Sequence, residues 1–534
     1  MNLRGKHGKA FWIWYAVIAL WAAACWGFFQ LAYQYHFFYQ EQNQLFLLSA
    51  EYVRSYFNKP AWAACLTGDF LTQLYYYLYL GPAILTAALL TVGDLTRRAM
   101  QRAGAWSHLA FATATVLMTA EAIMCFRVEY RLQSVVALAG GMAAYLVSSL
   151  LHRTRWWAAF ITIAAGSILT WWAFGYGLWA YWAMLAVEMA CAALKKNFSK
   201  RMAAYPVAML AALAAILPAT KHYCMTADKA LAYPGMGKLG APDFVLEKDF
   251  AVDNEYHFGN YHKVEQIVES SSFTTEQMLF FYNLVQAQKG ELPDKLLNHV
   301  PNQLGTFYAI GPNTPRLVIN NMNELYWALG DMTFTERAAM MCNVFAGQNR
   351  NVRMIKRLAE CNLVSGDTLA ANKYLRLLSQ TLAYSGWAKR MAGGDPKAMR
   401  YIIDKRQNTN NADTIRISDN LHMVMMELLD SNPGNTTALD YILCSDLLLK
   451  DITNFKRDYD RYCYDKGRER TKPIYQQALM IYLAGTNAGE EEWTKYIHDN
   501  NQVKRFAQYN KQRGNPQFKD TYWYYFDTAQ TPKP

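Results

Sequence analysis

The sequence has little charge for its length and lacks the cysteine patterns of disulfide-bonded or metal-binding domains. Charged residues make up 18% of the 534 positions, and the nine cysteines form neither a CxxC pair nor a Cys/His metal spacing. Their irregular spacing argues against a disulfide framework, so we expect mainly free, buried thiols. The net charge of +11 is accompanied by no nucleic-acid-binding motif, and we predict no nucleic-acid partner.

Charge is scarcest in the first 220 residues, where apolar runs are long. A transmembrane helix needs roughly 20 mainly apolar residues. Seven stretches meet this requirement, at about 11–33, 70–93, 107–126, 133–151, 157–174, 176–194 and 202–219. No small-residue cleavage site follows the first stretch, so we expect a retained membrane helix and not a signal peptide. After about residue 225 no run is long enough to cross a bilayer.

The basic residues give an orientation for these spans, because Lys and Arg near span ends stay in the cytoplasm. Basic clusters follow the second, fourth and sixth predicted spans, at 97–102, 153–155 and 195–201. The first nine residues carry Arg4, Lys6 and Lys9. A cytoplasmic N-terminus makes all these clusters cytoplasmic, and seven spans then place everything after residue 220 on the outer side.

The C-terminal half is helical in its periodicity, with apolar residues three and four positions apart. The stretch "YPGMGKLGAPDF" is rich in Gly and Pro and is typical of a linker. We therefore predict an all-α chain of three parts: a polytopic membrane bundle at 1–224, a linker at 225–253 and a soluble helical repeat domain at 254–534.

A loose repeat marks the start of that domain. Gly259, Gly290, Gly330 and Gly366 are each followed by Asn, Glu or Asp, and they lie 31, 40 and 36 residues apart. Glycine favours the left-handed turn at a helix end, and the residue after it can cap the next helix. The stretch 250–400 thus resembles tetratricopeptide repeats, whose period is 34, without their signature Trp and Pro. Such helical hairpins present a concave surface that suits a protein partner or serves as a spacer.

The predicted outer loop at 34–69 contains the first acidic residues on that side. Its rings are typical of the belt at a membrane–water interface, namely Tyr33, Tyr35, Phe37, Phe38 and Tyr39. The following stretch "EQNQLFLLSAEY" has the spacing of an amphipathic helix lying on the membrane surface. Glu41 and Asp69 stand near the two ends of this loop.

This arrangement resembles GT-C glycosyltransferases, which use lipid-linked sugar donors. They share a module of about seven spans whose first outer loop has surface helices and an essential acid just after span one. The resemblance covers about residues 1–220 and implies a catalytic role for Glu41, with Asp69 as a second candidate acid. A carboxylate there can deprotonate an incoming hydroxyl or hold a divalent cation.

Three further charged residues are site candidates. Arg127 and Arg131, in "CFRVEYRLQ", can bind the phosphates of a polyprenyl-phosphate donor, since guanidinium groups pair bidentately with phosphate. They can equally contact lipid headgroups or pair with Glu129. Glu121 lies within the third predicted span, where an acid either serves function or makes a buried hydrogen bond to a Tyr or Trp. For Glu188 in the sixth span we expect a pairing with Lys195 or Lys196.

Three stretches, "EQNQLFLLSAEYVRSYF", "GDFLTQLYYYLYLGP" and "DTYWYYF", carry a family-level resemblance. They resemble an uncharacterised, DUF6057-like family of Bacteroidota inner-membrane proteins. The resemblance implies a multi-pass inner-membrane protein with a cytoplasmic N-terminus and a periplasmic C-terminal domain, but no activity.

Two functions are therefore expected from different classes. The first is a GT-C-like glycosyltransferase that takes a polyprenyl-phosphate-linked donor and recruits its acceptor or partners through the repeat domain. The alternative is a non-enzymatic membrane scaffold whose repeats bind envelope proteins. A transporter is disfavoured, because the bundle has few charged or Pro/Gly-broken positions paired between its halves.

Overall fold

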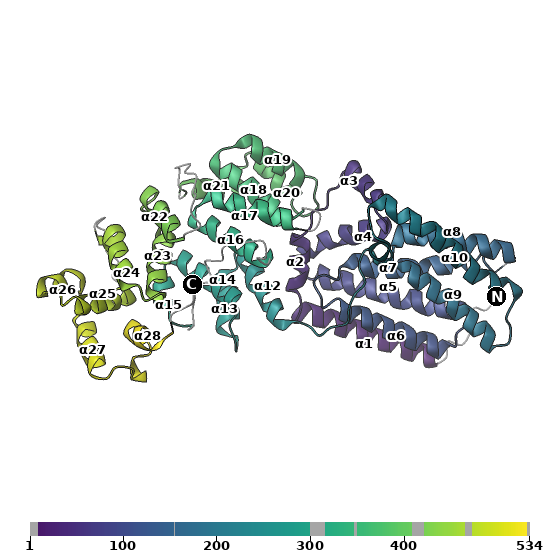
Figure 1. Cartoon of the computed structure of the whole chain (residues 1–534), viewed down its shortest axis with the longest axis horizontal. Coiled ribbons are helices and arrows are strands. Elements are labelled where there is room, and N and C mark those ends of the chain that lie inside the picture. The colour runs from purple at the N-terminus through teal and green to yellow at the C-terminus, as the bar shows by residue number, and fades with distance from the viewer. Residues whose placement is uncertain are drawn as a thin grey trace. The chain divides into compact units, whose positions relative to one another are not determined.

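The computed structural model describes residues 9–153, 155–299, 316–346, 350–407, 409, 421–464 and 472–530. Helices make up 77% of the described residues, which contain no strand, and this confirms the all-α prediction. The chain divides into two compact units (Figure 1). Unit 1 comprises Met1–Glu247 and Leu377–Gly386, and unit 2 comprises Lys248–Arg376 and Trp387–Pro534.

Unit 1 is a bundle of long helices that lie side by side, with shorter helices at one end (Figure 1). The long helices are α1 (Lys9–Leu31), α5 (Leu80–Arg102), α6 (Ser107–Met124), α7 (Leu132–Ser148), α8 (Trp156–Phe174), α9 (Gly177–Leu194) and α10 (Ala204–Thr220). The shorter ones include α2 (Tyr35–Gln42), α3 (Ala50–Ser55), α4 (Trp62–Thr72) and α11 (Ala227–Ala232).

Five segments of the described chain are long and apolar enough to cross a membrane. They are Trp14–Leu31, Ser107–Met124, Trp156–Phe174, Gly177–Leu194 and Lys200–Tyr223. The surfaces of these helices are suited to contact with lipid, because less than half of each segment is buried within the protein. Large apolar side chains such as Leu20, Val116 and Leu210 point outward, as lipid contact requires. The chain is thus a membrane protein by length and composition of its helices.

The two other predicted spans correspond to α7 and α5. The first is apolar but has only 17 residues, and α5 has 23 residues with Asp94, Arg97 and Arg98 inside it. The bounds predicted for the second span, 70–93, are wrong. Residues 73–79 form a 3₁₀ turn and a bend, and the long helix begins only at Leu80. The aromatic run "LYYYLYL" is apolar enough to resemble part of a span, but it lies in the turn and bend that lead into α5.

Close helix packing inside unit 1 depends on glycines. A Cβ atom on Gly141 of α7 would collide with the backbone oxygen of Gly177 in α9, and one on Gly177 would collide with the oxygen of Ala137. A Cβ on Gly140 would likewise overlap the ring of Phe174. Small residues of this kind let membrane helices approach closely, where dispersion contacts replace a hydrophobic driving force.

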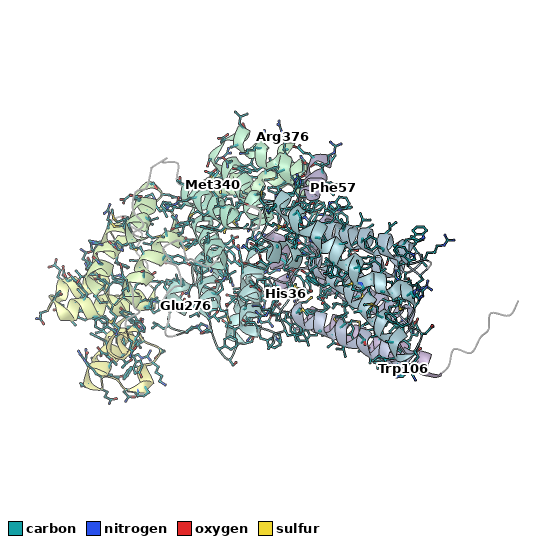
Figure 2. The ribbon with its side chains drawn as sticks, turned by 45° about the vertical axis from the view of Figure 1, so that its right-hand side comes forward. His36, Phe57, Trp106, Glu276, Met340 and Arg376 are labelled. Atoms are coloured by element: carbon teal, nitrogen blue, oxygen red, sulfur yellow. The ribbon has the colours of Figure 1, made fainter. Side chains whose placement is uncertain are left out.

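The two ends of unit 1 differ in composition. At one end the basic residues hydrogen-bond to neighbouring segments: Arg102 donates to the Ser149 hydroxyl, Arg153 to the Arg102 oxygen, Arg201 to the Arg153 oxygen and Lys195 to the Gly104 oxygen. We call this the basic end. Trp106 lies there, and His36 lies at the opposite end (Figure 2).

The opposite end, here called the loop end, is formed by residues 33–79, 125–131, 175–176 and 225–247. Hydrogen bonds join its parts: the Tyr33 hydroxyl donates to the Phe126 oxygen at 2.9 Å, and the Tyr176 amide donates to the Tyr233 oxygen at 2.8 Å. The Glu247 carboxylate accepts from the Tyr35 amide at the start of α2, where the helix dipole favours an anion. Segments far apart in sequence therefore cover this end together.

The loop end corrects the prediction of an interfacial belt and a continuous surface helix. Tyr33 and Phe37 are buried in the hydrophobic core of unit 1 and do not lie on its rim. The predicted helix after Glu41 is interrupted, because residues 43–49 are irregular between α2 and α3. Ser49 caps α3 by accepting from the Tyr52 amide. The loop thus folds into the bundle end as short packed helices.

Unit 2 is built from helical hairpins. Its helices are α12 (Phe244–His257), which begins in unit 1, α13 (Tyr261–Glu269), α14 (Glu276–Lys289), α15 (Leu292–Lys295), α16 (Arg316–Leu329), α17 (Met332–Phe345), α18 (Val352–Ser365), α19 (Thr368–Leu378), α20 (Ser385–Ala392) and α21 (Pro396–Gln407). The four predicted turn glycines all join two helices and have φ between 72° and 85°. The predicted hairpin turns are confirmed at these positions.

In the described residues, six more α-helices follow α21 and α22 (Leu421–Ser431). They are α23 (Thr436–Leu448), α24 (Ile452–Tyr459), α25 (Pro473–Gly485), α26 (Glu490–Tyr496), α27 (Asn500–Lys511) and α28 (Tyr522–Thr528). The aromatic end of the chain docks within unit 2: the buried Trp523 donates to the Gln477 oxygen at 3.0 Å, and Tyr522 to the Leu447 oxygen at 2.7 Å. The aromatic segment is therefore part of the hydrophobic core of unit 2.

A buried ion network lies within unit 2. Arg353 pairs with Asp253 at 2.8 Å and with Glu324 at 2.8 Å, and Arg357 pairs with Glu324 at 2.7 Å. All four side chains are more than nine-tenths buried. Because each charge is matched by hydrogen-bonded partners, the network ties α12, α16 and α18 together without an uncompensated charge.

Candidate functional site

Glu41 is a buried carboxyl at the loop end of unit 1. It lies near the C-terminus of α2 and is only 4% exposed. Its Oε2 accepts a hydrogen bond of 3.2 Å from the hydroxyl of Tyr384, which belongs to the Leu377–Gly386 segment of the same unit. That segment is held by the Leu48 amide, which donates to the Gln380 oxygen at 2.7 Å.

Burial changes the acidity of this carboxyl. Removal from water penalises the charged form and raises the pKa of Glu41 from 4.5 to about 8, although the Tyr384 hydroxyl lowers it. A carboxyl that titrates near neutral pH is suited to take up or release a proton in a reaction. The acidity of Glu41 therefore suits proton transfer near neutral pH.

Asp69, the second predicted acid, has its own set of partners. Its Oδ2 accepts a hydrogen bond of 2.7 Å from Tyr56, and its Oδ1 accepts from the Gln133 amide of α7. Gly68 beside it allows this approach, since a Cβ there would overlap the Gln133 backbone. Gln44 donates to the Asp69 backbone oxygen at 3.2 Å and so links the end of α2 to α4.

Glu121 is buried in α6 and has a tyrosine partner. The Tyr130 hydroxyl donates to its Oε2 at 2.7 Å and lies 3.1 Å from the Tyr176 hydroxyl, which donates to the Ser134 oxygen at 2.7 Å. This chain of hydrogen bonds links α6, α7 and α9 across the loop end. The buried hydrogen bond to a tyrosine, one of the two expectations for Glu121, is present.

Arg127 and Arg131 stand in the loop between α6 and α7. Arg127 is exposed and packs against Gly240, where a Cβ would come within 3.0 Å of its Nε. Arg131 is half-buried and directly precedes α7. Gln40, next to Glu41, donates to the Val128 oxygen at 3.1 Å, so the loop with the two arginines contacts α2.

The predicted residues thus share one end of unit 1 but each acid bonds to a different tyrosine. Tyr384, the partner of Glu41, was not identified from the sequence, because 343 residues separate the two. Glu188 also differs from expectation. It pairs with His152 and Arg153, each at 3.0 Å, and not with Lys195, which bonds to the Gly104 oxygen.

Fold and site together define an all-α membrane protein with a buried acid at one end of its helix bundle. Over residues 9–529 the chain matches DUF6057, described as a family of unknown function, and it belongs to this family. The predicted resemblance to a DUF6057-like family is thus confirmed. No curated protein and no solved structure matches the chain.

Proposed function

We propose that the protein is a GT-C-like membrane glycosyltransferase that transfers a sugar or glycan from a polyprenyl-phosphate donor to an acceptor hydroxyl. In this proposal unit 1 has seven spans in an inner membrane, the loop end faces the periplasm, and the hairpins of unit 2 recruit the acceptor or protein partners. The single observation that carries the proposal is the buried Glu41 carboxyl with its pKa near 8.

Glu41 acts as the general base in this reaction. Its carboxylate accepts the proton of the acceptor hydroxyl, the acceptor oxygen forms a bond to the anomeric carbon, and the bond from that carbon to the polyprenyl phosphate breaks. General base catalysis contributes about 10²- to 10⁴-fold to a rate. The Tyr384 hydroxyl, 3.2 Å from the carboxylate, already makes the hydrogen bond that an acceptor hydroxyl would make.

Arg127 and Arg131 are the proposed phosphate ligands. Guanidinium groups bind phosphate through paired, charge-assisted hydrogen bonds, which also stabilise the leaving phosphate. The bond between Gln40 and the Val128 oxygen supports this assignment, since it brings the arginine loop against the helix that carries Glu41.

The test is Glu41→Gln in a strain that lacks the chromosomal copy, at matched protein level. Gln keeps the shape of the side chain and can accept from Tyr384, but it cannot take up a proton. We expect the mutant to lose the envelope glycan that the wild type restores. An identical glycan profile in wild type, null and mutant strains would refute the transferase.

A non-enzymatic membrane scaffold is the second candidate. It is favoured by the pairing of each acid with a tyrosine, since bonds of this kind also occur in purely structural cores. A scaffold tolerates Glu41→Gln and Arg127→Gln but loses function when the concave face of 254–400 is altered. Crosslinking that recovers no protein partner for unit 2 would count against it.

A further inference from the structure

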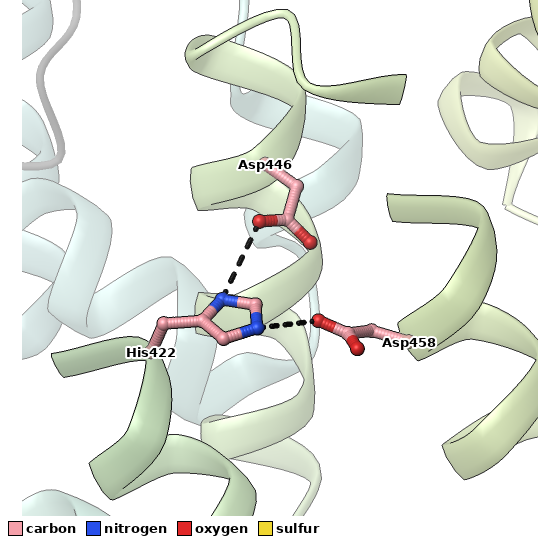
Figure 3. Close-up of side chains that lie close together, drawn as sticks. All are labelled: His422, Asp446 and Asp458. Carbon is pink, nitrogen blue, oxygen red and sulfur yellow. Dashed lines mark ion pairs between the residues drawn. The ribbon is translucent and has the colours of Figure 1, made fainter. Parts of the chain in front are cut away.

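Three residues of unit 2 bring metal-binding groups together where three successive helices meet. His422 comes from α22, Asp446 from α23 and Asp458 from α24. The imidazole Nε2 lies 2.9 Å from Asp458 Oδ2, and Nδ1 lies 3.6 Å from Asp446 Oδ1 (Figure 3). One nitrogen and one oxygen from each acid all lie within 4.8 Å of one another.

The two carboxyl groups are almost fully removed from water. Asp446 is 4% exposed and Asp458 0% exposed. Within the described residues, the buried Oδ2 of Asp446 has no hydrogen-bond partner. Figure 3 shows the Asp446 carboxylate turned toward the imidazole and toward Asp458. A buried oxygen without a partner destabilises the fold unless a hydrogen-bond donor or a cation contacts it. The cluster can therefore accept one further cation.

The guanidinium of Arg457 contacts two members of the cluster but not Asp446. The guanidinium of Arg457 donates to Asp458 Oδ1 at 2.9 Å and lies 2.9 Å from His422 Nε2. Its side chain is 54% exposed and can turn into solvent.

We propose that His422, Asp446 and Asp458 bind one divalent transition-metal ion, with Zn²⁺ as the best fit. An imidazole nitrogen with carboxylate oxygens is a typical donor set for zinc, and three protein ligands leave a position for water. Hard alkaline-earth ions prefer all-oxygen sites and fit this set less well. The metal takes the imidazole nitrogen that Arg457 now faces, and Arg457 keeps its bond to Asp458. This site is independent of the function proposed for unit 1.

A bound ion would join α22, α23 and α24 through side chains 24 and 12 residues apart in sequence. Because a metal that binds the folded state stabilises it by mass action, zinc should raise the unfolding midpoint of unit 2 in proportion to the logarithm of its concentration. The competing arrangement is an Asp–His–Asp triad without metal, in which the two imidazole nitrogens each face one acid.

The experiment uses the full chain in detergent, purified without a polyhistidine tag, stripped with a chelator and titrated with Zn²⁺ alone. Asp446→Asn and His422→Gln each remove one ligand. The matched control is His262→Gln, which removes a histidine that is 92% exposed and lies 3.8 Å from Glu265. Apo unfolding midpoints show which variants are folded.

We expect the wild type and His262→Gln to bind one more zinc ion per chain than the two ligand variants. Since loss of groups that only support a metal ligand costs 10- to 100-fold in affinity, loss of a ligand should raise the Kd by at least about 100-fold. Visible absorption of bound Co²⁺ gives a second readout, present in wild type and lost in Asp446→Asn. Equal zinc stoichiometry and equal Kd in all four proteins, or no binding by wild type, would overturn the proposal and favour the metal-free triad.

Discussion

Glu41→Gln should change how the stability of unit 1 depends on pH. The folded protein holds the Glu41 proton up to a pKa of about 8, whereas the unfolded chain releases it near the ordinary value of 4.5. Between these values the folded state binds more protons, so its stability falls as pH rises. Gln does not titrate, so the stability of the mutant should not include the decrease with pH that Glu41 causes in wild type.

The size of the effect follows from the two pKa values. One pKa unit corresponds to about 1.4 kcal/mol, so the penalty on folded wild type is about 1 kcal/mol at pH 5 and about 4 kcal/mol at pH 8. Relative to wild type, Glu41→Gln should therefore gain about 3 kcal/mol of stability between pH 5 and pH 8. For a unit of this size that is a shift in unfolding midpoint on the order of 10 °C.

The assay is thermal unfolding of both proteins in the same detergent at half-unit steps from pH 5 to pH 9. Glu51→Gln serves as the control, because Glu51 lies in the same loop and is exposed. The control should follow the wild-type curve. Parallel curves for Glu41→Gln and wild type across the whole range would show that Glu41 is not a buried, protonated acid.

Three further substitutions test separate parts of the structure. Tyr384→Phe removes the hydroxyl that lowers the pKa of Glu41, so the pH range of the stability loss should move upward; a downward move contradicts the bond. Gly141→Ala places a methyl group against the Gly177 oxygen, and we expect a loss of about 1–3 kcal/mol, measured as a lower unfolding midpoint. Arg353→Met leaves the buried Asp253 carboxylate without its cation, while Glu324 keeps Arg357, and should cost about 3–5 kcal/mol, measured by denaturant unfolding.

The last two substitutions have matched controls within the chain. Gly27→Ala adds the same methyl group where nothing lies within 4 Å, and its unfolding midpoint should stay near wild type. Arg505→Met breaks an exposed pair with Asp520 and should change stability by less than about 1 kcal/mol. If a control is as destabilised as its partner, the packing or charge network assigned here is not the cause.

Local patterns predicted the helical architecture well. Apolar runs located the long helices of unit 1, and Gly259, Gly290, Gly330 and Gly366 located four turns, because both features depend on residues close in sequence. The same reasoning misplaced the start of α5. The run around Tyr75 is as apolar as a span, but hydropathy does not record that this ring packs inside the bundle end.

Long-range contacts were beyond the sequence. The sequence predicts that the ring of Tyr33 lies at the membrane interface. This prediction is wrong because Phe126 and Phe244 pack on Tyr33 from distant segments, and such contacts leave no signal in the local sequence. Glu41 could be singled out by its position after the first span, but neither Tyr384 nor the raised pKa has a local signal. His422, Asp446 and Asp458 likewise match no recognised metal spacing, since only the packing of three helices joins them.

The most direct test of the proposed function is to measure the lipid-linked donor itself. Three strains are compared: the null strain, the null strain complemented with wild type, and the null strain complemented with Glu41→Gln. Membrane lipids are extracted from each, and polyprenyl-phosphate-linked sugars are quantified by mass spectrometry. If Glu41 is the general base of the reaction that consumes this donor, one such lipid-linked sugar accumulates in the null and mutant strains. Its level returns to a low value in the strain that carries wild type. The same lipid-linked pool in all three strains would contradict the account.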